Sequence, residues 1–269
     1  MELELTKVEV KEGIGILAMN NIKTYNAFNA QSIAEFNYAF TQLEEDPEVK
    51  VIVIKGLPKA FSSGGDVSTF YALNNSGGEA PDVSESVKGN INIPVRMKKC
   101  PKVVITSVSG AAAGAGASVA LAGDYVLMSD TAFIMVAFAQ IAHVPDTGVT
   151  YLLSKSIGTH RAFRLCAQAG TIKAQEALEL GIAEKVVPVD ELDEVTFKFA
   201  KKVAAGPLWV YKSIKEQMYE INYKDLEHYI NEVEFPLIMK CEYESKDFVE
   251  GVNAFVEKRK PVYTGKIEL

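Results

Sequence analysis

The stretch SGAAAGAGASVALAGD runs from Ser109 to Asp124 and follows directly after the apolar run VVITSV. It consists almost entirely of glycine, alanine and other small residues, and Asp124 is its only ionisable side chain. Small residues allow a backbone to come close to another group. Three interpretations fit this composition: an inert filler, a membrane segment, or a place where main-chain groups do chemistry. The rest of the chain is needed to distinguish between them.

The membrane interpretation fits this region poorly. The uncharged run from Val103 to Gly123 is long enough for a transmembrane helix. Its Gly, Ala and Ser residues contribute little transfer free energy, however, and no aromatic belt flanks it. The N-terminal sequence MELELTKVEVKEG has neither the basic nor the apolar region of a signal peptide. We therefore expect no membrane partner and a cytoplasmic location.

The composition limits the class of protein. The chain has 269 residues, 48% of them hydrophobic, and a formal net charge of -7. That length can bury a large core in one large domain or two smaller ones. The acidic balance argues against nucleic acid as a partner, because phosphate binding requires clustered Lys and Arg. Three scattered cysteines without CxxC spacing indicate ordinary thiols in a reducing compartment rather than a metal site.

Strand and helix signals alternate through most of the chain. Between the first two strands, Asn29 can cap a helix whose apolar residues recur at helical spacing. This alternation predicts an α/β core. The apolar runs that read as buried strands are GIGILAM (13–19), VIVIKG (51–56) and VVITSV (103–108).

Two parts of the chain depart from this alternation. Tyr71 to Asn92 is polar and rich in turn residues, so we expect a loop that is mobile in part. From about Glu194 onward the pattern is helical throughout. We therefore place an α/β core at residues 1–193 and a helical C-terminal region at residues 194–269.

Two glycine-rich turns, KAFSSGGD and SGAAAGAGAS, each follow a buried strand. Gly65 has no Cβ, so its N–H can face a ligand. Ala115 lies between two glycines at the predicted start of a helix, where N–H groups are unpaired. Two such amides could hold one carbonyl oxygen as it becomes an enolate. Alternatively, both segments are tight turns packed against the sheet; neither matches a phosphate-binding loop.

Six motifs, in order and nearly from end to end of the chain, resemble those of the crotonase (enoyl-CoA hydratase/isomerase) superfamily. The resemblance implies an α/β spiral of ββα units followed by a helical trimerisation region, and assembly into homotrimers or homohexamers. It also implies an acyl-CoA thioester substrate and no separate cofactor or metal. The motifs are NAFN (26–29), AFSSGGDV (60–67), SGAAAGAGASVALAGD (109–124), VPDTGVTYLL (144–153), AQEALELGIAEKVVP (174–188) and AFVEKRKPVY (254–263).

The same resemblance implies roles for particular residues. It places the oxyanion hole at the backbone amides of Gly65 and Ala115, although the family usually has glycine where Ala115 stands. Such a hole agrees with the interpretation, based on the residues of the two turns alone, that two amides could hold one carbonyl oxygen. The residues that it places at the acyl chain or coenzyme A are Ala27, Phe61, Ser63, Asp66, Val67, Gly114, Ser118, Phe138 and Lys258.

The two catalytic glutamates of the family's hydratases are missing from this sequence. The first position is Ser118, and the second falls near Ala137 and Phe138. Hydration needs one group to activate water while a proton reaches the α-carbon, so we do not expect efficient hydration. Asp146 stands where some isomerases of the family have their base. A double-bond shift needs only one base, which predicts an enoyl-CoA isomerase.

A base at Asp146 requires surroundings that raise its pKa, because an aspartate with an ordinary pKa of about 3.9 is a weak base. Alternatively, Asp146 caps the helix that begins near Thr147. His143, three residues earlier, is either a structural residue or a catalytic partner. Phe133, Phe138, Ile141 and Val144 are the residues that we expect to form an apolar wall.

Three other functions remain open at the level of sequence. A hydratase or an acyl-CoA decarboxylase of the same superfamily would keep the oxyanion hole. Loss of CO₂ itself generates an enolate, so a decarboxylase would need little else. A catalytically inactive CoA-binding homologue would bind the thioester and gain thermal stability without turnover.

Overall fold

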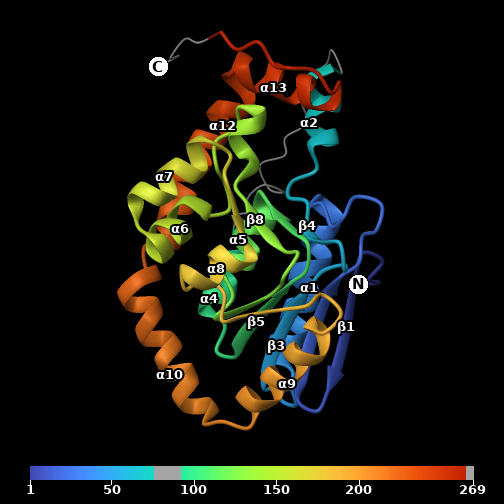
Figure 1. Cartoon of the computed structure of the whole chain (residues 1–269), viewed down its shortest axis with the longest axis vertical. Coiled ribbons are helices and arrows are strands. Elements are labelled where there is room, and N and C mark those ends of the chain that lie inside the picture. The colour runs from blue at the N-terminus through green and yellow to red at the C-terminus, as the bar shows by residue number, and fades with distance from the viewer. Residues whose placement is uncertain (76–91, 265–269) are drawn as a thin grey trace.

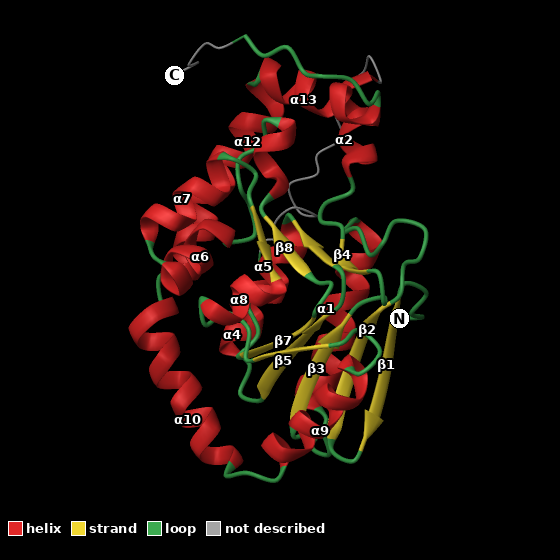
Figure 2. Ribbon diagram, in the orientation of Figure 1, coloured by secondary structure: helices red, strands yellow, loops and turns green. Residues whose placement is uncertain are grey.

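The structure, a computed structural model, describes residues 1–75 and 92–264. Two sheets lie at its centre with helices around them (Figures 1 and 2). The larger sheet has the strand order β1-β2-β3-β5-β7-β10, and the smaller has the order β4-β6-β8-β9. The strands are β1 Thr6–Lys11, β2 Ile14–Met19, β3 Val51–Lys55, β4 Ala60–Ser62, β5 Val103–Val108, β6 Ala111–Ala113, β7 Tyr125–Ser129, β8 Phe133–Met135, β9 Thr171–Lys173 and β10 Lys185–Val187.

Successive pairs of strands alternate between the two sheets. β3 and β4 are followed by α2 (Val67–Asn75), and β5 and β6 are followed by α5 (Ala115–Leu121). The first pair, β1 and β2, lies entirely in the larger sheet and is followed by α1 (Ala30–Glu45). From β2 to β10 the neighbours in the larger sheet pair in parallel. The predicted α/β fold of ββα units is therefore confirmed.

The central strands β3 and β5 of the larger sheet are buried on both faces, which explains their uninterrupted apolar runs. Successive side chains of a strand point to opposite faces. Val51 and Val53 of β3 accordingly pack in a cluster with α9 (Leu192–Ala204). Ile52 and Ile54 pack in the main core together with residues of α1.

Helix α1 begins where the sequence predicts. The Asn29 side chain accepts a hydrogen bond from the Ser32 N–H, and the Ser32 hydroxyl oxygen accepts one from the Asn29 N–H. This reciprocal pair satisfies two amides that the helix cannot pair internally. Apolar residues at helical spacing then face the core. Those that are buried are Ile33, Phe36, Ala39, Phe40 and Leu43.

The Gly/Ala run forms β6, a turn at Gly114, and α5, all of whose residues are buried. A Cβ on Gly116 would lie only 2.7 Å from Ser62 Cβ, so α5 packs against β4 too closely for a larger residue. Gly114 has φ 52° and ψ −124°, a conformation that favours glycine. Close packing therefore accounts for part of the small-residue composition.

One expectation about local structure is wrong. Tyr71 to Asn75 form the second half of α2 instead of a loop. The rest of the predicted loop, residues 76–91, lies outside the described residues. Helix α4 (Ile93–Lys99) begins directly after Asn92. Pro94 and three apolar residues of α4 are buried, so the chain re-enters the core there.

The C-terminal region is helical, as predicted, but α9 begins at Leu192 and packs against the larger sheet. The predicted boundary between residues 193 and 194 therefore falls inside a helix that covers the core. Helix α13 (Lys246–Val256) packs against α2 and against η1 (Ala137–Ile141), at the top of Figure 1. The other helices are α6 Val149–Ile157, α7 Thr159–Ala167, α8 Ala174–Glu179, α10 Leu208–Met218, η2 Tyr219–Tyr223, α11 Leu226–His228, η3 Tyr229–Glu234 and α12 Phe235–Glu244.

None of the helices in the described ranges is both long and apolar enough to cross a lipid bilayer.

Candidate active site

The two glycine-rich turns meet at a cavity of about 210 Å³. They touch closely: a side-chain atom on Gly114 would lie 3.6 Å from Gly64 Cα. Aromatic and aliphatic side chains from α2, η1 and α13 close the other sides. The lining residues are Ser63, Gly64, Gly65, Val67, Phe70, Ala113, Gly114, Met135, Ala137, Phe138, Gln140, Ile141, His143, Asp146 and Phe255.

The amide of Gly65 stands out among those of the first turn. The Ser63 N–H donates to Tyr25 O, the Gly64 N–H to Ser62 Oγ, and the Asp66 N–H to Phe28 O. Within the described ranges, the Gly65 N–H donates to no other atom of the chain. No atom lies within 4 Å of the place that a Gly65 Cβ would take, so this residue borders open space.

The second turn has the same pattern. The Gly114 N–H donates to Met135 O, whereas the Ala115 N–H has no acceptor in the part of the chain that the structure describes. Ala115 is the first residue of α5, so its amide has no partner within that helix. An unpaired amide away from bulk water is rare in folded proteins. Gly65 lines the cavity, whereas Ala115 is not among the lining residues but directly follows Gly114, which is. Two unpaired amides in this arrangement could both donate to one oxyanion.

The NAFN segment holds the first turn from behind. The Asn26 side chain donates to Phe61 O at 3.0 Å, and Ser62 Oγ donates to Asn26 O at 2.8 Å. The Phe28 N–H donates to Gly64 O. Because Asn26 and Ser62 are buried, these bonds fix the turn rigidly relative to the sheet.

Asp146 brings a carboxylate to the same cavity. Burial raises the pKa of Asp146 to about 6; the His143 charge and the Thr147 hydrogen bond oppose this rise, and Glu242 adds to it. Thr147 Oγ1 lies 2.8 Å from Asp146 Oδ1 and 2.8 Å from Ser118 Oγ. A hydroxyl has one hydrogen, so Thr147 donates either to the Asp146 carboxylate or to Ser118 Oγ at any one time. Ser118 Oγ in turn donates to the backbone O of Asp146, at 3.5 Å.

The backbone of Thr147 is unusual. Its φ is +54°, which is an outlier for a β-branched residue. Such strain is found where surrounding contacts over-determine a conformation, often at functional sites. It directs the Thr147 hydroxyl to the Asp146 carboxylate while Gly148 continues into α6.

The Asp146 side chain does not cap α6. The N-cap of that helix is Gly148, which has no side-chain cap. Both carboxyl oxygens of Glu234 accept from the Gly148 N–H, at 2.9 and 3.1 Å. Burial raises the pKa of Glu234 to about 9, although the Gly148 hydrogen bond lowers it. Glu234, from η3, is thus the residue that satisfies this helix terminus.

The predicted binding residues are divided between the cavity and its surroundings. Ala27 and Phe61 are buried in the fold, Asp66 Oδ1 accepts from the N–H and hydroxyl of Ser68 in α2, and Lys258 is exposed just beyond α13. Six of the predicted residues border the cavity: Ser63, Gly65, Val67, Gly114, Phe138 and Asp146.

The predicted apolar wall is partly correct. Phe138 and Ile141 line the cavity, whereas Val144 packs behind it with Phe248 and Val252. Phe133 is not among the lining residues; it lies in β8. Sequence analysis missed Phe70, Met135, Gln140 and Phe255 as lining residues, as well as Glu242, which contacts His143.

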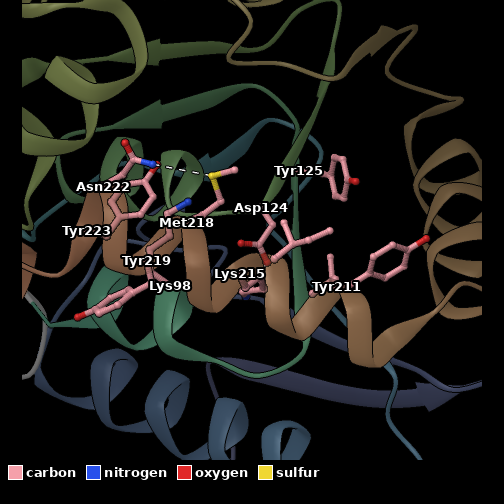
Figure 3. Close-up of a pocket in the computed structure, with 11 residues that line it drawn as sticks. Lys98, Asp124, Tyr125, Tyr211, Lys215, Met218, Tyr219, Asn222 and Tyr223 are labelled. Atoms are coloured by element: carbon pink, nitrogen blue, oxygen red, sulfur yellow. Dashed lines mark hydrogen bonds and ion pairs between the residues drawn. The ribbon is translucent and has the colours of Figure 1, made fainter.

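A second cavity, of about 350 Å³, lies beneath α10 (Figure 3). Lys215 Nζ lies 2.6 Å from Asp124 Oδ2 and also donates to Lys102 O and Met97 O. Its three hydrogens are thus all used to fasten α10 to the core. Burial lowers the pKa of Lys98 to about 8, and its amine lies over the Tyr223 ring. Among the described residues, no cluster of three or more His, Cys, Asp or Glu could hold a metal ion.

Comparison with known proteins places this geometry in a family. Trans-2-decenoyl-[acyl-carrier-protein] isomerase of Streptococcus mutans is 32% identical over 99% of this chain and 100% of its own. 1,2-Epoxyphenylacetyl-CoA isomerase of Escherichia coli is 33% identical over the same shares. An enoyl-CoA hydratase crystal structure from Mycobacterium avium subsp. paratuberculosis superposes with a TM-score of 0.86, at 28% identity, over 98% of this chain and 100% of that one. The sequence model described as enoyl-CoA hydratase/isomerase matches residues 9–266, and this chain belongs to that family.

Proposed function

We propose that this acyl-CoA enzyme moves a carbon–carbon double bond of an enoyl thioester between the 3,4 and 2,3 positions, with Asp146 as the base. The observation that carries the proposal is one carboxylate, with a raised pKa, at the same cavity as the unpaired amide of Gly65, with the unpaired amide of Ala115 directly after the lining residue Gly114. The cavity thus combines a proton acceptor with donors for a developing negative charge.

The reaction follows from these groups. Asp146 removes a proton from the α-carbon of the 3-enoyl thioester, and the electron pair moves onto the thioester oxygen. The amides of Gly65 and Ala115 donate to that oxygen and stabilise the dienolate. The protonated Asp146 then returns its proton to the γ-carbon, which leaves the conjugated 2-enoyl thioester. No atom is gained or lost, so a single acid–base group is sufficient.

The pKa of Asp146 suits this role. A group that removes a proton and returns it works best when its pKa is close to the operating pH. A pKa of about 6 leaves Asp146 ionised at neutral pH, yet makes it more basic than a solvated aspartate. The apolar wall that raises this pKa also excludes water from the intermediate.

Hydration is less well supported by the same cavity. Ala137 and Phe138 line it where a hydratase would have a second carboxylate, and Ser118 is buried behind Asp146. Two groups are needed to activate water and deliver a proton. Asp146 supplies one of them.

The cavity accommodates part of the substrate. Pockets that enclose a whole drug-sized ligand span roughly 300–1,000 Å³. A cavity of about 210 Å³ would hold the acyl chain and the thioester, with the carrier outside. The carrier could therefore be coenzyme A or a protein-bound phosphopantetheine, and the similarity to the Streptococcus mutans isomerase favours testing both.

Self-association is part of the same proposal. Trp209 is 77% exposed on α10, and Ile221 is 72% exposed on η2. Large apolar side chains gathered on one surface mark protein contacts. We infer that this surface joins copies of the chain into a homotrimer or homohexamer. Trp209→Asp should lower the mass measured by sedimentation; an unchanged mass would remove α10 from the contact.

The function is tested by offering the purified protein a 3-enoyl-CoA and following the absorbance of the conjugated product. Asp146→Asn should reduce kcat/KM by about 10²–10⁴, the usual contribution of a general base. Asp124→Asn makes the same chemical change at the second cavity and should keep kcat. Full activity of Asp146→Asn would exclude this base. Parallel assays with 2-enoyl and malonyl-type thioesters test hydration and decarboxylation.

A further inference from the structure

His143 occupies a closely packed aromatic environment beside the proposed base. Its side chain is 3% exposed, and its ring centroid lies 5.1 Å from that of Phe248, 5.9 Å from that of Phe70, and 6.1 Å from that of Phe138. These rings belong to three different elements, α13, α2 and η1. The imidazole is therefore held in one orientation, and it lines the same cavity as Asp146.

Both ring nitrogens of His143 face acceptors. Nδ1 lies 2.5 Å from Val144 O, and Nε2 lies 2.9 Å from Oε1 of Glu242, whose side chain is only 7% exposed. A carbonyl oxygen can only accept, so Nδ1 carries a hydrogen. An ionised Glu242 also only accepts, so beside that carboxylate Nε2 carries a second hydrogen and the ring is an imidazolium. Burial lowers the pKa of His143, but the Glu242 hydrogen bond and nearby Asp146 together raise it above its usual value.

In this ion pair the positive partner, His143, lines the cavity, whereas the negative partner, Glu242, does not. The His143 charge favours the ionised form of Asp146, whereas burial and Glu242 favour the protonated form. Glu234 is a further acid that interacts with Asp146. Without the imidazolium, only the Thr147 hydrogen bond would oppose the effect of burial on the Asp146 pKa, and a protonated aspartate cannot remove a proton. His143 is thus the cation whose charge opposes the rise in the Asp146 pKa that burial against the apolar wall causes.

We propose that His143, kept as an imidazolium by Glu242, is a positioning residue that keeps the Asp146 carboxylate charged inside an apolar cavity. Glu242 lies 99 residues away in the chain and does not line the cavity; it acts on Asp146 through His143 and, as the smallest contribution, through its own negative charge. The proposal rests on the proposed function for its kinetic consequence. The charge state of His143 can be measured without any substrate.

The variant His143→Gln/Glu242→Gln removes both charges and keeps polar side chains that can bond each other. In wild-type protein, kcat/KM for the 3-enoyl thioester should fall below about pH 6 as Asp146 takes up its proton. In the double variant this fall should move upward by about one pH unit or more, which corresponds to a loss of about fivefold or more at pH 6. Near pH 9 activity should approach that of wild type, with little change in KM. A uniform loss at every pH, or an unmoved profile, contradicts the proposal.

Imidazole NMR provides the test that does not depend on activity or on the variant folding. The chain has three histidines, and the other two, His160 and His228, are exposed. His160→Gln and His228→Gln assign their signals and should leave catalysis unchanged. The remaining histidine should lose its second ring hydrogen at a higher pH than an ordinary histidine, because the pKa of His143 is raised. A titration at or below the ordinary histidine pKa would overturn the proposal, whatever reaction the enzyme catalyses.

A third measurement separates this proposal from the proposed function. The pH dependence of unfolding with and without Asp146→Asn reports the titration of Asp146 directly. Adding His143→Gln/Glu242→Gln to both proteins should move that titration upward by about one unit or more. If it moves but no thioester is isomerised, the positioning role holds and the reaction was assigned wrongly. If it does not move in an active enzyme, His143 is only structural.

Discussion

The cavity beneath α10 and the cavity at the two glycine-rich turns both contain charged groups away from water, but they differ in whether their hydrogen-bond donors are paired. Beneath α10, all three N–H donors of the Lys215 amine have acceptors, and Asp124 also accepts a hydrogen bond from the Val104 N–H. At the other cavity, the amides of Gly65 and Ala115 have no acceptor within the described ranges. The paired groups of the larger cavity therefore stabilise the fold, whereas the unpaired amides at the smaller cavity remain available to a ligand.

Among the variants that compare the two cavities, the largest effect is expected from disturbing an unpaired donor. Gly114→Ala places a Cβ at φ 52° and ψ −124°, so the turn must shift and carry the Ala115 amide with it. Loss of one oxyanion donor should reduce kcat by about 10²–10³. Steady-state kinetics on the 3-enoyl thioester measure this loss.

Gly181→Ala is the matched control for Gly114→Ala. Gly181 also has a positive φ, of +73°, but no atom lies within 4 Å of its Cβ position and it lies after α8, away from the lining residues. Both variants should lose similar stability, and only Gly114→Ala should lose rate. Equal rates for the two would show that the position of the Ala115 amide does not matter.

The next largest effect is expected from removing one partner of the Lys215–Asp124 ion pair beneath α10. Lys215→Met removes the ion-pair partner of Asp124 and leaves Lys98 as the cation that still interacts with it, and removal of one partner from a buried ion pair typically costs about 3–5 kcal/mol. The side chains are 10% and 18% exposed, so the lower end of that range is expected. Chemical denaturation should show the loss, while kcat of the folded protein stays unchanged. Adding Asp124→Asn should restore part of the stability; a fall in kcat instead would mean that this cavity contributes to the reaction.

The smallest effect concerns the pH dependence of folding. Because the pKa of Asp146 is raised to about 6, the folded protein holds this proton more tightly than the unfolded chain. The resulting stability is present below about pH 4 and is lost as pH rises through 6. Asp146→Asn removes this dependence, so its stability relative to wild type should increase by about 2–3 kcal/mol between pH 4 and pH 8. Parallel urea denaturation at each pH measures the difference; a constant offset would mean that Asp146 titrates normally.

Much of the fold could be predicted because its signals are local. The apolar runs of β2, β3 and β5, the Asn29 capping box and the two glycine-rich turns each occupy a few consecutive residues. The path of Tyr71 to Asn75 was predicted wrongly because a polar helix end next to many turn residues lacks a strong period. The start of α9 was misplaced by two residues for the related reason that helix boundaries carry weak signals.

For the candidate site, the sequence by itself determined which residues could do chemistry: two turns of small residues, one aspartate, and no second carboxylate beside it. Tertiary structure alone decided which amides stay unpaired, that Glu234 rather than Asp146 serves Gly148, and that Glu242 reaches His143 from 99 residues away. Steric demands and apolar spacing act between near neighbours, so they can be read along the chain. Pairing of buried polar groups depends on which distant segments the fold brings together, and no local pattern encodes it.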